Sequence, residues 1–461
     1  MSNYAVRLRS RWRRNSRLAR LGARIGLGHA TTSARKIFAN AERKESLSRE
    51  RELRTAQQVA NELGNMKGAL MKLGQMASYL DDGLPESLRL ALAQLQSQAP
   101  PMSVQLVHEV ICEEFGREVS ELFVAFDEEP IAAASIGQVH RAIIIDPATN
   151  AERAVAVKVQ YPGVAEAIDA DLRTADLLGA LLAFGFKSLN PEEMVAEIKE
   201  RLREELDYGR EKENQKMFAD FYRGHPFIHV PAVIDHLSSS RVLTTELING
   251  STFDELMTWD QHERDLAGET IFRFVFRSLY RFRAFNGDPH PGNYLFHGNG
   301  RVTFLDFGLI KHFTVEEMDM FKSMVQAAVI DHDMERYRKI VENAGMLQSN
   351  LDVTTEDVGD YFSHFYEPVR ESKDMTWTTT YATSIVRHTF DRSSPIAQYA
   401  TVPRSFVFIQ RINLGLYAIL GQLGARGNYR RIAEELWPMT NSPASTALGE
   451  LEATWLQQSN N

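Results

Sequence analysis

The sequence predicts an α+β protein in which helical segments flank a central unit that mixes strands and helices. Two β-branched runs, "QVHRAIIID" and "RAVAVKVQ", are separated by the turn-forming letters "PATNAE", which is typical of a β-hairpin. Amphipathic helical patterns precede this hairpin and dominate the chain after Phe313. We therefore expect four regions: a basic amphipathic segment over 1–40, a helical extension over 41–120, a central domain over 121–330 and a helical C-terminal extension over 331–461.

The composition is that of an ordinary globular protein, with 44% hydrophobic and 25% charged residues in a chain of 461. This length is sufficient for two or three domains with a sizeable core. The one cysteine, Cys112, excludes an internal disulfide framework and a zinc site built on cysteines, and it agrees with a reducing compartment. The best apolar run, "LLGALLAFGF" from Leu177 to Phe186, is too short to span a bilayer, so we expect no transmembrane helix.

Residues 1–40 contain ten Lys and Arg and no Asp or Glu, although the whole chain has a net charge of −9. Apolar residues recur among these cations in an imperfect helical stripe: Leu8, Trp12, Leu18, Leu21 and Ile25. The segment fits a helix on an anionic membrane, a transit peptide if the source has mitochondria, or a solvated arm that packs on the acidic body. The expected location is therefore cytoplasmic, peripheral at a membrane, or mitochondrial in a eukaryote. Nucleic acid is not an expected partner, because the body is acidic.

The remaining elements follow in order. Helical patterns occupy 41–98, and "VQLVHEVICEEFG" is a further amphipathic helix that Gly116 closes. After the hairpin, helical patterns return over 163–219, and short strands are expected at "FIHVPAVI", "RVLTTELI" and "RVTFLDFG". The tail from Thr440 onward, which begins "TNSPASTALGE", is expected to be loose.

The central region contains the side chains that a phosphoryl-transfer site requires. Such a site needs a lysine for phosphate oxygens, a carboxylate that holds the lysine, oxygen ligands for Mg²⁺ and an acid that orients the attacking hydroxyl. Lys158 lies in "VAVKV", on a strand between buried valines. Upstream, "AAASIGQV" matches the end of the G-x-G-x-x-G-x-V phosphate loop at Gly137 and Val139, with Ala132 and Ala134 at its first two glycines. Taken alone, Lys158 is better explained as a lysine on the solvent face of an edge strand, and a lone Gly-x-Val indicates little.

The stretch "FNGDPHPGNYLFHGNGRVTFLDFGLIKHF" supplies two carboxylates and an amide. Asp288 and Asn293 have the spacing of a kinase catalytic loop, in which the aspartate orients the substrate proton and the asparagine binds metal. Asp306, followed by Phe307 and Gly308, has the position of the second magnesium ligand, and hard Mg²⁺ prefers oxygen donors. An Asp-Pro turn and a strand end explain each motif separately, but they do not explain the order of the motifs after the lysine strand.

Four motifs together resemble the UbiB/ADCK (AarF-domain) family of atypical protein-kinase-like proteins. Lys72-Leu73-Gly74-Gln75 is similar to the family's KxGQ motif, and "AAASIGQVH" is similar to its alanine-rich replacement for the glycine-rich loop. Glu205-Leu206-Asp207 is similar to the ExD motif, and "GDPHPGN" to the catalytic loop. The resemblance covers about residues 60 to 330. It implies a bilobal protein-kinase-like fold with N-terminal and C-terminal helical extensions.

The resemblance also implies a role for each matching residue. In the family the KxGQ helix folds over the site where a kinase's peptide substrate would lie, so Lys72 is expected near Glu205 or Asp207. Glu211 is assigned as the partner of Lys158, with Glu204 and Glu205 as alternatives. The implied catalytic residues are Asp288, Lys158, Lys72, Gln75, Glu205 and Asp207, and the implied magnesium ligands are Asn293 and Asp306. The implied nucleotide-binding residues are Ala132, Ala133, Ala134, Ser135, Ile136, Gly137, Gln138, Val139, Lys158, Glu211, Glu246 and Ile248.

The implied cofactors are ATP and Mg²⁺, and the implied activity is that of an ATPase or small-molecule kinase that supports isoprenoid-quinone (ubiquinone) biosynthesis at a membrane. The implied partners are ATP or ADP, an anionic lipid membrane and quinone-biosynthesis enzymes. A pseudokinase scaffold that uses nucleotide binding as a conformational signal is the alternative. A true protein kinase is less favoured, because a helix begins at Thr314, soon after Gly308, and leaves no room for a long activation segment.

Overall fold

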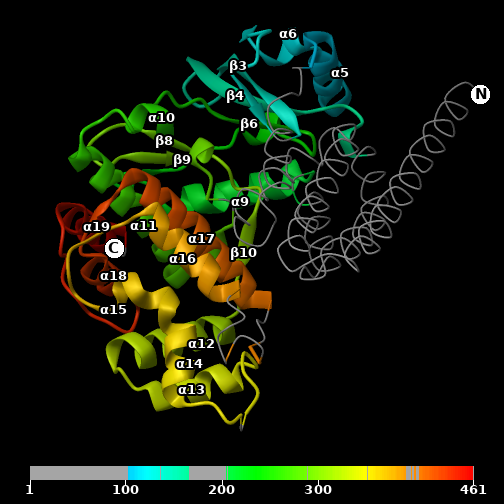
Figure 1. Ribbon diagram of the computed structural model, residues 1–461. Helices are drawn as coiled ribbons and strands as arrows, with labels where there is room; N and C mark the ends of the chain where they lie inside the picture. Colours follow the sequence, from blue (N-terminus) through cyan, green and yellow to red (C-terminus); the bar gives the residue numbers. More distant parts are fainter. Residues whose placement is uncertain are drawn as a thin grey trace, which may run out of the picture. The chain divides into compact units, whose positions relative to one another are not determined.

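The computed structural model describes residues 102–134, 136–165, 204, 206–287, 289–349, 351–390, 396, 399–400 and 404–459 (Figure 1). The chain divides into two compact units. The first comprises Met1–Arg153 and Val157–Asp207, and the second comprises Ala154–Ala156 and Tyr208–Asn461. This division does not test the four regions expected from the sequence, which stay a prediction.

The described part of the first unit is a helix pair followed by antiparallel strands. The helices are α5 (Val104–Phe115) and α6 (Val119–Leu122), and the strands are β1 (Ala125–Phe126), β2 (Ala132–Ala134), β3 (Gly137–Ile145) and β4 (Glu152–Gln160). Both β1 and β2 pair antiparallel with β3, and β4 follows β3 in the sheet. The predicted hairpin is therefore confirmed.

Local sequence explains these elements directly. On β4, Val157 and Val159 are fully buried whereas Lys158 between them is partly exposed, as the two-residue period of a strand requires. Helix α5 buries Val107, Val110 and Ile111 and ends at Gly116. Gly116 adopts the left-handed conformation with φ 63°, and its N–H donates to the Cys112 carbonyl, which is the C-terminal cap expected from the sequence.

The second unit consists mainly of helices and short strands. Its strands are β5 (Ile228–His229), β6 (Val242–Glu246), β7 (Ala284–Asn286), β8 (Tyr294–Phe296), β9 (Val302–Phe304), β10 (Ile310–His312), β11 (Met375–Thr376) and β12 (Arg426–Gly427). Its α-helices are α9 (Tyr208–Phe221), α10 (Phe253–Leu256), α11 (Gln261–Phe282), α12 (Val315–Val325), α13 (Met334–Asn343), α14 (Thr355–Ser363), α15 (Glu367–Arg370), α16 (Thr379–Phe390), α17 (Arg404–Leu423), α18 (Tyr429–Leu436) and α19 (Ala447–Ser459). The 3₁₀ turns η1 (Asp235–Leu237), η2 (Pro291–Asn293) and η4 (His364–Tyr366) and the π-helical turn η3 (Gln326–Ile330) complete it.

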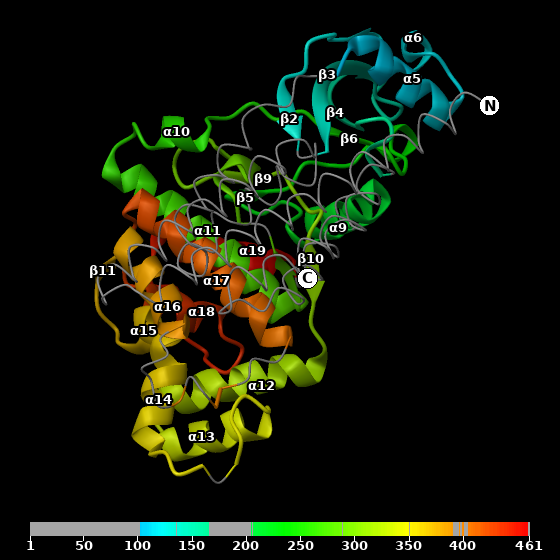
Figure 2. The same ribbon diagram turned by 45° about the vertical axis from the view of Figure 1, so that its right-hand side comes forward.

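Helix α11 is the centre of this unit. Asp260 caps its start by accepting from the Glu263 N–H, and most of its length is buried. Helices α17 and α18 pack on α11, and α16 packs along α17 (Figure 2). The buried apolar residues of the central strands and the C-terminal helices form one continuous core. The mixture of helices and sheets agrees with the predicted α+β class.

One expectation from the sequence is wrong. The tail after Thr440 is not loose, because residues 447–459 form α19, which buries Leu448, Glu452 and Trp455. The Trp455 indole N–H donates to the Arg223 carbonyl at 3.1 Å, so the tail is fixed to the end of α9. The apolar run Leu177–Phe186 lies outside the described residues. Within the described part of the chain, no helix is long and apolar enough to cross a membrane.

Candidate active site

In the first unit, the alanine-rich loop is a tight β-turn. Ala134 pairs with Gly137 and Ala132 with Val139, so the chain reverses within two residues between β2 and β3. Ser135 lies outside the described residues. Ile136 is buried, and its carbonyl accepts from the Tyr161 N–H at 2.9 Å. The loop is therefore fixed by backbone pairing on both sides of the turn.

A buried hydrogen-bond network supports this loop from inside. The Gln138 side chain accepts from the Met102 N–H at 2.9 Å, and its amide nitrogen lies 3.2 Å from the Met102 carbonyl and 2.9 Å from His140 Nε2. His140 Nδ1 lies 2.8 Å from the Asp127 carbonyl, so the neutral tautomer with Nδ1–H satisfies both contacts. Burial is the main cause that lowers the pKa of His140. The Gln138 side chain thus belongs to the framework, and any nucleotide contact at this position would come from its backbone.

Lys158 and the ExD segment lie on the same side of β4. Lys158 and Gln160 are two residues apart on the strand and therefore point to the same face. Gln160 Nε2 donates to the Leu206 carbonyl at 3.1 Å, which holds the turn that leads to Asp207. Asp207 itself is exposed. Lys72, Gln75 and Glu205 lie outside the described residues, so the expected proximity of Lys72 to the ExD carboxylates stays a prediction.

In the second unit, two of the predicted carboxylates flank one glycine. A Cβ atom on Gly308 would lie 3.3 Å from Asp306 Oδ1 and 3.7 Å from Glu211 Oε2. The Gly308 N–H donates to Asp306 Oδ1 at 2.9 Å, which orients that carboxylate. Glu211 lies in the first turn of α9 and is buried. The strand end after β9 and helix α9 therefore bring Asp306 and Glu211 together around the backbone of residue 308.

Backbone and amide hydrogen bonds connect the catalytic-loop segment to this carboxylate pair. The Leu305 N–H donates to the Asn293 carbonyl at 2.9 Å, and strands β8 and β9 pair directly with Tyr294 opposite Phe304. Asn286 Nδ2 donates to the Asp306 carbonyl at 2.7 Å. Asn293 and Asp306 thus come from adjacent, hydrogen-bonded segments of one rigid substructure. Asp288 lies outside the described residues, and its role stays a prediction.

The aromatic residue next to Asp306 is anchored in the core. Phe307 is fully buried, and its ring lies 5.0 Å from that of Phe218 on α9. Asn214, also on α9, donates from Nδ2 to the Phe307 carbonyl at 3.0 Å. These contacts fix α9, and with it Glu211, against the segment that carries Asp306.

The donor set fits a magnesium ion. Asn293 and Asp306 offer amide and carboxylate oxygens, which hard Mg²⁺ prefers over nitrogen or sulfur. Among the described residues there is no group of three His, Cys, Asp or Glu side chains with metal-binding geometry. A metal held by these two residues would therefore complete its shell with phosphate oxygens and water, as Mg²⁺ does in nucleotide sites.

Hydrogen bonds fix the segment from Glu246 to Ile248, which is expected to contact adenine. Glu246 ends β6, and its N–H donates to the Ala232 carbonyl at 2.8 Å. Its carboxylate accepts from the Ala232 N–H at 3.3 Å and lies 3.4 Å from His229 Nε2. The Leu247 N–H donates to the Ala154 carbonyl, which joins this segment to β4. Ile248 follows and is partly exposed.

Sequence reasoning missed three residues that support this site. Asn214 and Asn286 donate to the carbonyls of Phe307 and Asp306, and nothing in their local pattern marks them. Gly415 on α17 lies against the catalytic loop, because a Cβ there would lie 2.4 Å from Pro289 Cγ. A glycine inside a long helix was the only available signal, since it usually has a packing reason.

Comparison with known proteins identifies the family. A model of the ABC1 atypical kinase-like domain matches residues 94–341. The "Atypical kinase coq-8, mitochondrial" of Caenorhabditis elegans is 33% identical over 311 residues, which are 66% of this chain and 40% of that protein. The "Atypical kinase COQ8B, mitochondrial" of Rattus norvegicus is 34% identical over 285 residues, 61% of this chain and 52% of that protein. The chain thus spans about half the length of these two relatives.

A solved structure agrees with the family match. It is described as "The complex structure of Rv3197-erythromycin from Mycobacterium tuberculosis", and it is 31% identical, with a TM-score of 0.61. The match covers 86% of this chain and 98% of that one. The predicted kinase-like α+β fold is therefore confirmed. The chain belongs to the ABC1 atypical kinase-like family, as its resemblance to the UbiB/ADCK (AarF-domain) proteins predicted.

Proposed function

We propose that the chain is an Mg²⁺-dependent, ATP-binding atypical kinase that acts as an ATPase or a small-molecule kinase. The observation that carries this proposal is the arrangement of Asp306 and Glu211 around Gly308, tied to the Asn293 segment by a backbone hydrogen bond. An oriented carboxylate beside an amide residue is the pair that a metal-bound triphosphate requires. Family membership supports the same assignment.

Each residue has a distinct part in this proposal. Lys158 would bind phosphate oxygens from β4, and the alanine-rich loop would cover them with its backbone. Asn293 and Asp306 would hold Mg²⁺, which when bound neutralises charge on the phosphates. Asp288 would orient the attacking hydroxyl or water. Because Ala132 and Ala134 carry Cβ atoms where the kinase phosphate loop has glycine, we expect slow turnover.

The finer assignment is to isoprenoid-quinone biosynthesis at a membrane surface. The UbiB/ADCK resemblance implies this pathway, and the basic segment over 1–40 supports contact with anionic lipid. Quinone-biosynthesis enzymes are the proposed protein partners. Quinone profiling of a deletion strain, complemented with wild type or Asp306→Asn, tests this assignment. Normal quinone levels in the uncomplemented deletion strain would reject it.

The nucleotide site itself is tested by Asp306→Asn, with Asp319→Asn as the matched control. Both changes remove one carboxylate charge, but Asp319 is exposed on α12 and pairs only with Lys322 among the described residues. We expect Asp306→Asn to weaken Mg-ATP binding by about tenfold or more, because charge-assisted contacts contribute roughly 1.5–3 kcal/mol. Isothermal titration calorimetry measures this directly. Equal affinity in both variants would show that Asp306 is not a metal ligand.

Turnover separates the enzyme from a pseudokinase scaffold. Phosphate release from ATP, measured with and without anionic vesicles, should depend on Asp288 if the chain is an enzyme. We expect Asp288→Asn to bind Mg-ATP but to lose turnover and to fail in complementation. A scaffold would instead tolerate Asp288→Asn in cells while still requiring Asp306.

A further inference from the structure

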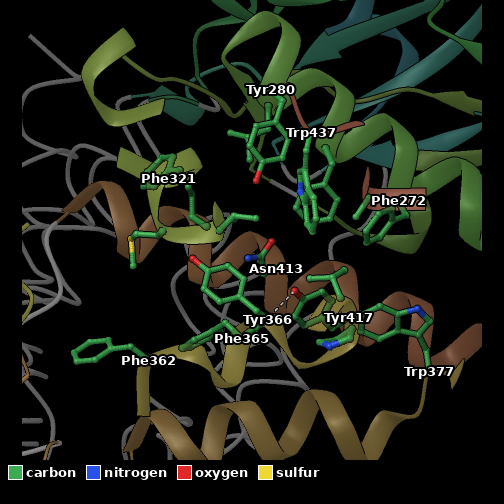
Figure 3. A pocket seen from close by; sticks show the side chains of 18 of the residues that line it. Phe272, Tyr280, Phe321, Phe362, Phe365, Tyr366, Trp377, Asn413, Tyr417 and Trp437 are labelled. Atoms are coloured by element: carbon green, nitrogen blue, oxygen red, sulfur yellow. Dashed lines mark hydrogen bonds between the residues drawn. The ribbon is translucent and has the colours of Figure 1, made fainter. Parts of the chain in front are cut away.

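The second unit contains an apolar cavity that the candidate active site does not use (Figure 3). Its walls come mainly from α11, α12, α14, η4, α15, α17 and the end of α18. Ten of its nineteen lining residues are aromatic. Aromatic walls favour ring-shaped ligands, because stacked and edge-to-face contacts add to the burial of apolar area.

The size and charge of the cavity limit what it can hold. Its volume is about 80 Å³, several times the roughly 10–15 Å³ that one water molecule requires. None of the described residues that line it carries a charge. A charged ligand would lose its hydration without gaining a partner, so the occupant has to be uncharged. One ring fits a space of this size.

Asn413 gives the cavity one polar anchor. Its Oδ1 atom is buried and has no hydrogen-bond partner within the part of the chain that the structure describes. Leaving a buried carbonyl oxygen unpaired costs about 1–3 kcal/mol, so such atoms normally have a partner. The Asn413 amide and the Tyr280 hydroxyl point into the same space from α17 and α11 (Figure 3).

The other polar groups of the lining differ in their hydrogen bonding. The Tyr417 hydroxyl donates to the Phe365 carbonyl at 3.2 Å. The Trp377 indole N–H, a buried donor of the lining, has no hydrogen-bond partner among the described residues. Among the described lining residues, Asn413 Oδ1 and Trp377 Nε1 are the buried side-chain atoms without a hydrogen-bond partner, and of these two only Asn413 Oδ1 is an acceptor.

The cavity lies directly behind the catalytic loop. Ile409, Asn413 and Tyr417 recur every four residues along α17 and face the cavity. Gly415 lies on the other face of the same helix and meets Pro289. Helix α12 changes to the π-helical turn η3 directly after the lining residue Val325, and such turns are frequent at functional sites.

We propose that this cavity is a ligand site for a small, uncharged aromatic molecule that carries one N–H or O–H donor. The ring packs among the aromatic walls, and the donor bonds to Asn413 Oδ1. An occupant in this position is separated from the catalytic loop only by the width of α17. The site involves no group of the nucleotide chemistry, so its test is independent of the proposed function.

Aniline and toluene are matched probes for this site. They have nearly the same shape and are both uncharged at neutral pH, but only aniline carries N–H donors. Ligand-observed NMR titrations of the full chain without nucleotide give both dissociation constants. We expect aniline to bind about fivefold more tightly, the factor that one net hydrogen bond gives. Failure of both probes to bind wild type would overturn the proposal and leave a water-filled cavity.

Two variants assign the binding to this cavity. Asn413→Leu keeps the number and branching of the side-chain heavy atoms but removes the acceptor, so the preference for aniline should fall to about one while toluene still binds. Ala433→Met extends a flexible apolar side chain from the α18 wall and should exclude both probes, with circular dichroism to verify folding. A preference for aniline that persists in Asn413→Leu, or unchanged binding in a folded Ala433→Met protein, would refute the site.

Discussion

Glu452 on α19 is the residue whose substitution we expect to damage the second unit most. Its carboxylate is buried and accepts from Arg277 Nε at 3.0 Å, from Arg277 Nη2 at 2.8 Å and from Arg273 Nη1 at 2.9 Å. Burial alone would raise the pKa of Glu452, but contacts with His225, Arg277 and Arg273 outweigh it and lower the pKa well below the ordinary 4.5. The carboxylate is therefore charged in the folded protein.

The loss of stability expected for Glu452→Gln depends on whether each arginine keeps another carboxylate partner. Arg273 keeps two carboxylates, Glu269 at 2.7 Å and Glu435 at 2.8 Å. Both hydrogen bonds that Arg277 makes within the described residues go to Glu452. A glutamine amide accepts only one of them and turns its NH₂ group toward the guanidinium. The amide nitrogen would take the place of Oε2, which accepts from both Arg277 Nη2 and Arg273 Nη1. Losing these two charge-assisted bonds at about 1.5–3 kcal/mol each agrees with the ~3–5 kcal/mol that breaking a buried ion pair costs.

Urea unfolding followed by circular dichroism and tryptophan fluorescence measures this loss. Trp455 lies on the same helix as Glu452 and reports the release of α19. Glu450→Gln is the matched control, because Glu450 is exposed on that helix, and we expect its effect to stay within about 0.5 kcal/mol. If the two variants unfold at the same urea concentration, the ionic cluster does not stabilise the unit and the reasoning is refuted.

Two further expectations concern the catalytic loop and the alanine-rich loop. Gly415→Ala should weaken Mg-ATP turnover and stability together, because its methyl group would displace Pro289, and overpacking costs about 1–3 kcal/mol. Gly421→Ala, whose methyl would meet the Thr378 backbone instead, should lower only the melting temperature; equal turnover losses in both would contradict a role in positioning the loop. Burial lowers the pKa of His140 below 6.5, so this side chain takes up a proton more readily in the unfolded chain than in the folded protein. The free energy of unfolding should therefore fall as the pH drops below 6.5. His140→Gln should flatten the dependence of melting temperature on pH, and an unchanged slope would contradict this.

The parts of the fold that short sequence patterns encode could be predicted. The β3–β4 hairpin follows from two β-branched runs around a turn. The start of α12 follows from Thr314 and Glu317, whose side chains each accept from the other's backbone N–H, at 3.2 and 2.9 Å. The order of lysine strand, catalytic loop and Asp306 motif was sufficient to predict a kinase-like chain, because chemistry fixes both residue types and spacing.

Contacts between distant segments could not be predicted in the same way. The Asn214 and Phe307 positions are 93 residues apart, and a lone asparagine carries no local signal for such a partner. The tail that contains α19 was expected to be loose because of its polar turn formers. A glutamate such as Glu452 is ordinarily exposed, so nothing in its local sequence indicates burial. Its burial depends on two arginines in α11, which are also ordinarily exposed residues. Pairing between buried charges therefore places residues inside the protein that the hydrophobic pattern of the sequence predicts to be exposed.

These distant contacts connect the C-terminal helices to the proposed chemistry. Helix α17 places Gly415 against Pro289, next to the predicted catalytic acid, and helix α19 neutralises the arginines of α11. Helix α11 leads directly into β7, whose Asn286 orients the Asp306 segment. Because a metal-binding carboxylate has to be preorganised, we expect the helices after residue 331 to stabilise the proposed metal site. Shortening the chain at α19 should therefore impair Mg-nucleotide binding as well as stability, although no residue of that helix belongs to the proposed metal site.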